Sequence, residues 1–224
     1  MAGWSEPPQD EPARRKMIER DLTQRGITDR RVLAAMASVP RDRFVGQELS
    51  EHAYADRPLP IGLGQTISQP LMVALMLQAL ELRATDRVLE VGTGSGYAAA
   101  VASRLAGYVH GVERLVRLAG TAAARLRELD YGNVRVHVGD GRLGWPAAAP
   151  YDAILVSAAG RELPTALADQ LVEGGRLVVP LGPSGEQRLV RMRRLAADEW
   201  QSEDLGGVRF VPLLSGVEGE DATS

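Results

Sequence analysis

A short apolar segment that leads directly into three alternate glycines limits the fold of this chain more than any other feature. The segment is Val88-Leu-Glu-Val-Gly-Thr-Gly-Ser-Gly-Tyr97. Its valines and leucine predict a buried strand, and Gly92, Gly94 and Gly96 allow the backbone to turn sharply and to lie against a ligand. The pattern therefore predicts that a nucleoside-containing ligand binds at the carboxyl end of this strand.

Two common glycine-loop motifs do not fit this segment. A dinucleotide-binding loop places its third glycine one residue later, where this chain has Tyr97. A phosphate-binding P-loop requires a Lys-Ser or Lys-Thr pair, which the segment lacks. The loop therefore belongs to another class of nucleoside-binding site.

Carboxylates stand beside the glycine loop and at the ends of the next two predicted strands. Glu90 precedes the glycines, Glu113 ends the second strand, and Asp140 follows the third. Because parallel strands end at one edge of a sheet, Glu113 is placed to accept both ribose hydroxyls and Asp140 to accept from an adenine amino group. The alternative is that both carboxylates only cap helices. The set resembles the cofactor site of S-adenosylmethionine-dependent methyltransferases.

The composition is that of a single globular enzyme domain. The chain has 224 residues, 45% of them hydrophobic, and no cysteine, which excludes disulfides and thiolate metal sites. A formal net charge of −3 and 4% aromatic residues give little attraction for nucleic acid. The first residues lack the order of a signal peptide, and no apolar stretch reaches the roughly 20 residues of a membrane span. We expect a cytoplasmic monomer without metal, nucleic acid or membrane partners.

Helix and strand patterns alternate after residue 70. The predicted helices cover residues 71–82, 97–105, 115–129 and 163–171, and the predicted strands cover residues 87–91, 107–112, 134–138, 151–157 and 176–179. This alternation predicts an α/β fold, with a doubly wound, mostly parallel sheet covered by helices on both faces. We expect one domain over residues 14–217, divided into 14–70, 71–182 and 183–217, with disordered ends at 1–13 and 218–224.

The N-terminal segment contains two predicted helices and an unusual loop. Residues 17–25 and 29–39 are amphipathic, and Thr28 is the predicted N-cap of the second helix. The segment Pro58-Leu-Pro-Ile-Gly-Leu-Gly-Gln-Thr-Ile-Ser-Gln-Pro70 is too apolar for an exposed loop and too rich in proline and glycine for a helix or a central strand. A long ordered loop of this character is usually functional.

The C-terminal part of the domain predicts antiparallel strands. Residues 187–195 alternate arginine with aliphatic residues, and residues 208–214 are again apolar. A polar stretch that includes Asp198 and Gly206 separates them and predicts the turn. The expected end of the sheet is therefore an antiparallel pair.

Four segments of the chain are characteristic when taken together. They are Gly64-Gln-Thr-Ile-Ser-Gln-Pro70, Glu90-Val-Gly-Thr-Gly-Ser-Gly96, Gly139-Asp-Gly141 and Val208-Arg-Phe-Val-Pro-Leu213. They resemble the protein-L-isoaspartate O-methyltransferase family, and the likeness runs from Met17 to Leu214. The resemblance implies methyl transfer from S-adenosylmethionine to the free α-carboxylate of L-isoaspartyl residues in damaged proteins and peptides, which initiates repair through a succinimide.

The resemblance also implies roles for individual residues. Ser68 is the implied catalytic residue, whose hydroxyl holds the substrate carboxylate, and Phe210 and Val211 lie on the peptide-binding side. The implied cofactor-binding residues are Gln65, Thr66, Ile67, Glu90, Gly92, Thr93, Gly94, Gly96, Glu113, Asp140 and Gly141. The competing interpretations are helix capping for Ser68 and core packing for Phe210 and Val211.

The implied reaction requires no general base. A carboxylate has an ordinary pKa of about 4 and is already ionised at neutral pH. Holding oxygen, methyl carbon and sulfur in one line can lower the barrier by about 7–11 kcal/mol. His110 and His137 fall within predicted strands, where a structural role is more common than a catalytic one. Ser68 is therefore expected to position the substrate and not to act as a nucleophile.

The chain departs from the family in the loop after the fourth predicted strand. Family members usually have Ala-Ala-Pro followed by a small residue or proline, whereas this chain has Ala158-Ala-Gly160-Arg161-Glu162. Arg161 offers an anion contact or an obstacle to bulky substrates at the edge of the site. Two other functions stay open: a methyltransferase of a specific peptide or small molecule, and a non-enzymatic module that senses the cofactor.

Overall fold

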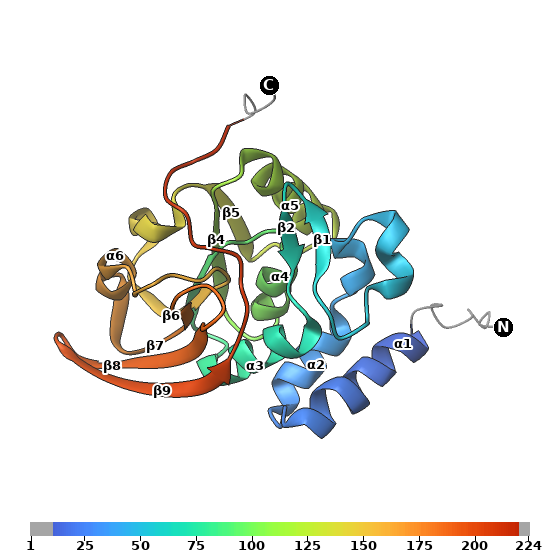
Figure 1. Cartoon of the computed structure of the whole chain (residues 1–224), viewed down its shortest axis with the longest axis horizontal. Helices are drawn as coiled ribbons and strands as arrows, with labels where there is room; N and C mark the ends of the chain where they lie inside the picture. The colour runs from blue at the N-terminus through green and yellow to red at the C-terminus, as the bar shows by residue number, and fades with distance from the viewer. Residues whose placement is uncertain (1–10, 220–224) are drawn as a thin grey trace.

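A seven-stranded sheet forms the centre of the molecule (Figure 1). The computed structural model describes residues 11–219. The strands lie in the order β5-β4-β3-β6-β7-β8-β9, in which the first five are mutually parallel and β8 and β9 are antiparallel to their neighbours. Their bounds are β3 (Arg87–Val91), β4 (Tyr108–Glu113), β5 (Val134–Val138), β6 (Tyr151–Val156), β7 (Leu171–Leu181), β8 (Arg188–Ala196) and β9 (Glu199–Gly207). The predicted fold class is confirmed.

Helices cover both faces of this sheet. They are α1 (Glu11–Lys16), α2 (Arg30–Ser38), α3 (Pro70–Leu80), α4 (Tyr97–Ser103), α5 (Val116–Glu128) and α6 (Thr165–Asp169), with a π-helical turn at Met17–Leu22 and short 3-10 helices at Thr23–Arg25, Arg41–Phe44, Gln47–His52, Gly141–Leu143 and Pro146–Ala148. No helix within residues 11–219 is long and apolar enough to cross a membrane.

Side chains that alternate along the central strands divide the core into two clusters. Val88 and Ala153 belong to the cluster that includes α2, α3 and α4, whereas their neighbours Leu89 and Ile154 belong to the cluster that includes α6. All four side chains are fully buried. Parallel strands need cover on both faces, which explains why these strands are continuous apolar runs in the sequence.

The order of the strands reverses beside β3. From β3 the chain passes to β4 and β5 on one side, then returns to β6, which pairs with the other side of β3. The connections diverge at such a point and leave a crevice at the carboxyl ends of the strands. The ends of β3, β4 and β6 therefore bring Gly92, Glu113 and Ser157 to one shared space.

The first helix begins earlier than the sequence predicts. α1 starts at Glu11, and the predicted helix over residues 17–25 is a π-helical turn followed by a 3-10 turn. The prediction of disorder is therefore wrong for residues 11–13, and the rest of that extension, residues 1–10, lies outside the described residues. The acidic Glu11 in the first turn and the basic residues in the last turn of α1 both favour the helix.

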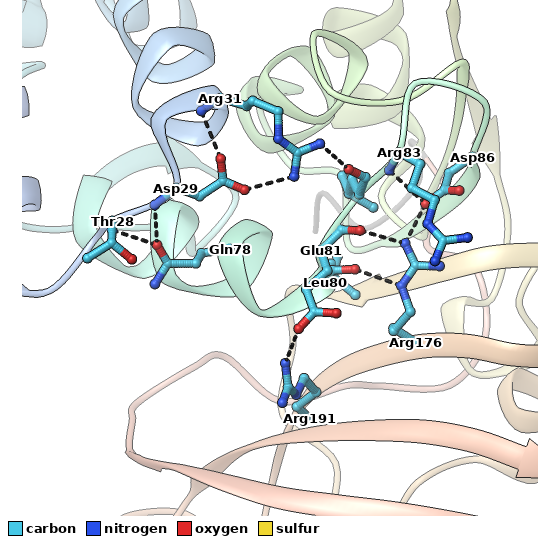
Figure 2. Close-up of polar contacts among 11 residues, drawn as sticks. Thr28, Asp29, Arg31, Gln78, Leu80, Glu81, Arg83, Asp86, Arg176 and Arg191 are labelled. Carbon is cyan, nitrogen blue, oxygen red and sulfur yellow. Dashed lines mark hydrogen bonds and ion pairs between the residues drawn. The ribbon is translucent and has the colours of Figure 1, made fainter.

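The N-cap of α2 is Asp29 and not the predicted Thr28. The Asp29 carboxylate accepts a hydrogen bond from Arg31 N at 2.8 Å. The backbone amides of Thr28 and Asp29 both donate to Gln78 Oε1 of α3, at 2.7 and 2.9 Å (Figure 2). A side chain of α3 thus also holds this helix start, and that contact is one that no local sequence pattern reveals.

The last strand also lies earlier than predicted. β9 covers Glu199–Gly207, and the turn before it contains Ala197 and Asp198 alone. The predicted strand at residues 208–214 is instead an extended segment outside the sheet. It runs beside the loop after β6, where Ala159 N donates to Val211 O and Leu213 N donates to Ala159 O, both at 2.8 Å.

The polar residues of β9 explain this error. Their polarity predicts a turn, but β9 is the edge strand of the sheet and its acids pair with arginines of β8. Arg191 pairs with Glu203 at 2.6 Å, and Arg188 pairs with Asp204 at 2.8 Å. Opposite charges on adjacent strands stabilise the hairpin, which an apolar pattern alone does not predict.

The predicted disordered tail begins with an ordered residue. Glu218 N donates to Arg114 O at 3.0 Å, Glu218 O accepts from Val116 N at 3.2 Å, and the side chains of Arg114 and Glu218 pair at 2.9 Å. We call residues 213–218 the C-terminal strap. Disorder at Glu218 is therefore a wrong prediction, and residues 220–224 lie outside the described residues.

An arginine on β7 holds the C-terminal end of α3 (Figure 2). The Arg176 guanidinium donates to Leu80 O at 2.8 Å and to Glu81 O at 2.9 Å, and it forms a buried ion pair with Asp86. The Glu81 carboxylate in turn pairs with Arg191 of β8 at 2.8 Å. These contacts join α3, the segment before β3, and two strands of the sheet.

Replacing Asp86 should destabilise the fold strongly. Asp86→Asn leaves the buried Arg176 charge without its counter-ion, which we expect to lower the free energy of unfolding by about 3–5 kcal/mol. Asp204→Asn breaks an exposed pair and should change the stability only slightly. Urea denaturation of both variants measures the free energy of unfolding. An equally small loss of stability in both variants would contradict a stabilising role for the buried pair.

Candidate active site

Two adjoining hollows open at the carboxyl ends of β3, β4 and β6. Thr66, Gly92, Gly94 and Ser157 line both. The first hollow is completed by the loop after β4 and by residues 211–214. The second is completed by a group that includes Ile67, Ser68, Glu90, Thr93 and Tyr97. We call the two hollows together the pocket.

The glycine loop adopts backbone angles that favour glycine. The φ angles of Gly92, Gly94 and Gly96 are 82°, 54° and 89°, all in the left-handed region. Gly92 and Gly94 line the pocket, but Gly96 does not. Gly96 is the N-cap of α4, where a Cβ would lie 3.2 Å from Leu126 Cδ1. The third glycine therefore serves the packing of α4 against α5.

Glu113 connects the glycine loop to the loop after β4. Its Oε2 accepts from Gly94 N at 2.9 Å, and its Oε1 accepts from Leu115 N at 3.0 Å. Each carboxylate oxygen has two lone pairs, so the side chain can still accept hydrogen bonds from a ligand. The residue lines the first hollow, where the sequence predicts the ribose.

Two polar groups in the second hollow are buried without partners. Among the described residues, Glu90 Oε2 and Thr93 Oγ1 have no hydrogen-bond partner. Burial raises the pKa of Glu90 well above its usual value, and the nearby Glu113 carboxylate raises it further. Buried polar atoms are nearly always paired in folded proteins, so these two indicate a polar ligand at this place.

The proline-rich segment forms a hairpin beside the pocket. β1 (Leu59–Gly62) pairs with β2 (Gln65–Ile67) as a separate two-stranded sheet (Figure 1). The hairpin contributes Gln65 and Thr66 to the first hollow, and Thr66, Ile67 and Ser68 to the second. The N-cap of α3 is Gln69, so the capping interpretation of Ser68 does not apply.

Asp140 and Gly141 occupy different positions relative to the pocket. Gly141 lines the first hollow, whereas Asp140 does not. The Asp140 carboxylate accepts from Arg142 N at 2.9 Å and from Gly216 N of the C-terminal strap at 2.7 Å. Asp140 thus caps a 3-10 helix, as the capping alternative predicts. An adenine contact by Asp140 stays a prediction.

Only one of the two predicted peptide-binding residues lines the pocket. Val211 lines the first hollow. Phe210 lies outside both hollows and packs against the core. Its backbone is held by Gln187, whose side chain accepts from Phe210 N at 2.6 Å and donates to Phe210 O at 3.2 Å. Core packing is therefore part of the role of Phe210.

Sequence reasoning missed several residues around the pocket. Ser157 lines both hollows and could have been found, because it follows β6 at the same sheet edge as Gly92. Gly111 lies in β4 beneath the glycine loop, where a Cβ would be 2.4 Å from Thr93 Oγ1. No motif marks Gly111, because the contact depends on the packing of β4 against the loop.

The histidines of β4 and β5 lie outside the pocket. His110 Nδ1 and His137 Nε2 are 3.0 Å apart, and the ring of His137 stacks on Trp145 at 4.1 Å between centroids. Burial lowers the pKa of both, that of His110 to about 4. This is the geometry of a structural pair. Within the described part of the chain, no cluster of three or more His, Cys, Asp or Glu side chains could hold a metal ion.

Comparison with known proteins identifies the family. The family model of protein-L-isoaspartate(D-aspartate) O-methyltransferase (PCMT) matches residues 13–218. The chain belongs to the PCMT family. It is 58% identical over 204 residues to protein-L-isoaspartate O-methyltransferase 2 of Pelobacter propionicus, covering 91% of this chain and 90% of that protein. It is 53% identical over 223 residues to the Methylorubrum extorquens enzyme of this name, covering 97% of each.

Solved PCMT structures share the fold. One protein-L-isoaspartate O-methyltransferase aligns with a TM-score of 0.83 and 29% identity, covering 91% of this chain and 67% of that chain. A second, described as a PCMT from Plasmodium falciparum in complex with S-adenosyl-L-homocysteine, aligns with a TM-score of 0.77 and 29% identity, covering 90% of this chain and 98% of that chain. The family resemblance in the sequence is therefore confirmed, and the cofactor of the family is S-adenosylmethionine.

Adding a methyl group at Gly111 should disturb the glycine loop. In Gly111→Ala the new Cβ would displace Thr93, which we expect to cost about 1–3 kcal/mol of stability and to weaken binding of S-adenosylhomocysteine. Gly120→Ala is the matched control, because nothing lies within 4 Å of a Cβ there. Alanine in that helix should stabilise the fold by roughly 0.5–1 kcal/mol.

Thermal denaturation and calorimetric titration of both variants check this. Unchanged ligand affinity in Gly111→Ala would show that the glycine loop does not depend on close packing against β4.

Proposed function

We propose that this protein transfers a methyl group from S-adenosylmethionine to the free α-carboxylate of L-isoaspartyl residues in damaged proteins and peptides. One observation supports the proposal most directly. Ser68, from the family-specific segment, lines the same hollow as Gly92 and Gly94 of the glycine loop. A group that holds the acceptor and a loop that holds the donor therefore face one space. The methyl ester then allows succinimide formation and repair.

The polar groups of the pocket fit S-adenosylmethionine. We assign the ribose hydroxyls to Glu113, and the charged amino acid part to Glu90 and Thr93, whose buried oxygens are free within residues 11–219. Gly94 lines both hollows, and a Cβ there would lie 3.3 Å from Ile61 Cδ1 of the hairpin, so the loop packs closely against the hairpin at this point. The other assigned residues that line the pocket are Gln65, Thr66, Ile67, Gly92 and Gly141.

The chain contributes orientation and exclusion of water. When bound, S-adenosylmethionine supplies an electron-poor methyl group that an ionised carboxylate can attack without a base. Ser68 is assigned to hold that carboxylate through its hydroxyl, and Val211 and Phe210 to border the peptide. The apolar side chain of Ile67, which is buried beside Ser68, keeps water from the attacking oxygen.

The surroundings of the enzyme follow from its surface charge and composition. A net charge of −3 disfavours binding to phosphate backbones and anionic lipids. The complete absence of cysteine is compatible with a reducing compartment. We therefore assign the enzyme to the cytoplasm, as a monomer that acts on damaged polypeptides.

Methyl transfer should distinguish an isoaspartyl peptide from its aspartyl twin. With labelled S-adenosylmethionine, we expect label in the isoaspartyl peptide alone, because its α-carboxylate is free whereas that of the aspartyl peptide is part of the main chain. Scintillation counting of the separated peptides measures this. Equal labelling of both peptides, or of neither, would overturn the proposed function, and transfer to a small molecule alone would favour the other methyltransferase hypothesis.

Binding of S-adenosylmethionine should release a proton from Glu90. Without ligand, the raised pKa keeps the Glu90 carboxyl protonated at pH values where a glutamate is ordinarily ionised. The positive charge of bound S-adenosylmethionine lowers that pKa, because a nearby cation favours the ionised carboxylate. Affinity should therefore rise with pH until Glu90 is ionised in the free protein as well, and then level off. Glu90→Gln should remove this rise, whereas the exposed Glu199→Gln should keep it.

Calorimetry in buffers of different ionisation enthalpy measures the released proton. The same pH dependence in wild type and Glu90→Gln would show that Glu90 does not titrate on binding.

A further inference from the structure

We propose that Arg41 is a positioning residue that holds Ser68 against the wall of the pocket. The proposal rests on the function proposed above, because Ser68 is the residue assigned to hold the substrate carboxylate. Arg41 opens the 3-10 helix Arg41–Phe44 and follows Pro40. It does not line the pocket, and its side chain is 0% exposed. A fully buried guanidinium beside an active-site residue requires a reason.

The hydrogen bonds of Arg41 fix two main-chain positions at once. Arg41 Nη2 donates to Ser68 O, and Arg41 Nε donates to Ala53 O, both at 2.7 Å. The guanidinium is planar and rigid, so both carbonyls are held at a set spacing from one group. The backbone of Ser68 therefore cannot move away from Arg41 without breaking this bond.

The face of the same guanidinium lies over the ring of Tyr97, a residue that lines the second hollow. The Arg41 guanidinium carbon is 4.7 Å from the centroid of the Tyr97 ring. Tyr97 is the first residue of α4, is 1% exposed, and lines the second hollow together with Ser68. A cation above an aromatic face is attracted to it, most strongly when buried. Arg41 thus connects Ser68 to the helix that begins at the glycine loop.

A second contact fixes the chain just after Ser68. Asp56 Oδ1 accepts from Leu71 N in the first turn of α3 at 3.0 Å, and the other Asp56 oxygen pairs with Arg25. Burial lowers the pKa of Arg41 from its ordinary value, and the Asp56 charge is one of the influences that oppose this lowering. Residues 68–71 are therefore held at both ends, by Arg41 before the helix and by Asp56 within it.

The position of Ser68 makes this support important for the reaction. Ser68 lies between the end of β2 and the start of α3, so two separate elements could shift it. Displacement of a positioning group by about 1 Å can cost about 10²-fold in rate. Arg176 makes the same kind of contact with carbonyls at the far end of α3, away from the pocket. It provides a control that shares the carbonyl contacts, although Arg176 also forms an ion pair with Asp86.

Arg41→Lys and Arg176→Lys test the proposal. Each substitution keeps the positive charge but loses the planar guanidinium, whose donors are held in a fixed arrangement. We expect Arg41→Lys to lower kcat for an isoaspartyl peptide by about 10- to 100-fold, with a change of less than about threefold in the Kd of S-adenosylhomocysteine, because Arg41 does not line the pocket. Arg176→Lys should lose stability but keep kcat within about twofold, measured where circular dichroism shows all variants folded.

A double-mutant cycle with Ser68→Ala separates positioning of the Ser68 hydroxyl from a general contribution of Arg41 to the stability of the fold. Alanine keeps the carbonyl that Arg41 binds and removes the hydroxyl that it positions. If Arg41 acts through that hydroxyl, Arg41→Lys should lower kcat by less than about twofold in the Ser68→Ala background. Equal effects of Arg41→Lys in both backgrounds, or equal losses of kcat in Arg41→Lys and Arg176→Lys, would overturn the proposal.

The result can be separated from failure of the proposed function. If the wild type does not methylate the isoaspartyl peptide, the proposed function fails. Amide hydrogen exchange alone then tests whether Arg41 holds the backbone at Ser68. Faster exchange of the amides within residues 68–71 in Arg41→Lys, but not in Arg176→Lys, would support the positioning contact. Unchanged exchange there would overturn it.

Discussion

Helix α3 is held at both ends by buried guanidinium groups that donate to main-chain carbonyls. Arg41 binds the carbonyl of Ser68 before the helix, and Arg176 binds the carbonyls of Leu80 and Glu81 at its end. Eight of the eleven residues of α3 are buried, and so are both arginine side chains that bind these carbonyls. An arginine carries several donors in a fixed arrangement and can satisfy two carbonyls at once. The place of Ser68 relative to the sheet depends on the bond from Arg41.

The carboxylates of the pocket share a position at strand ends but differ in their surroundings. Glu113 accepts two backbone amides, whereas Glu90 Oε2 has no partner within the described residues. Both could be predicted from the sequence, because parallel strands end at one edge. The sequence predicts the same position for Asp140, yet the backbone amide of Gly216, far along the chain, donates to its carboxylate. A local sequence pattern predicts where a side chain lies, but not which group from a distant part of the chain forms a hydrogen bond with it.

The same distinction applies to the fold. β3 could be predicted residue for residue, because its largely apolar run ends directly at the glycine loop. β9 could not, because ion pairs with β8 stabilise it and its own residues are polar. The start of α2 depends on Gln78, and the contact of Arg41 with Ser68 spans 27 positions of the chain. These contacts join residues that are far apart in the chain, so local sequence patterns do not predict them.

The C-terminal strap has a practical consequence for handling the protein. Arg114 binds the strap at Gly216 O and at Glu218, and it directly follows the pocket residue Glu113. A purification tag fused after Ser224 would therefore extend from a segment anchored beside the cofactor pocket. A tag fused before α1 would join the N-terminal helices, on another side of the molecule (Figure 1). Preparations tagged at opposite ends should not be treated as equivalent when ligand affinities are compared.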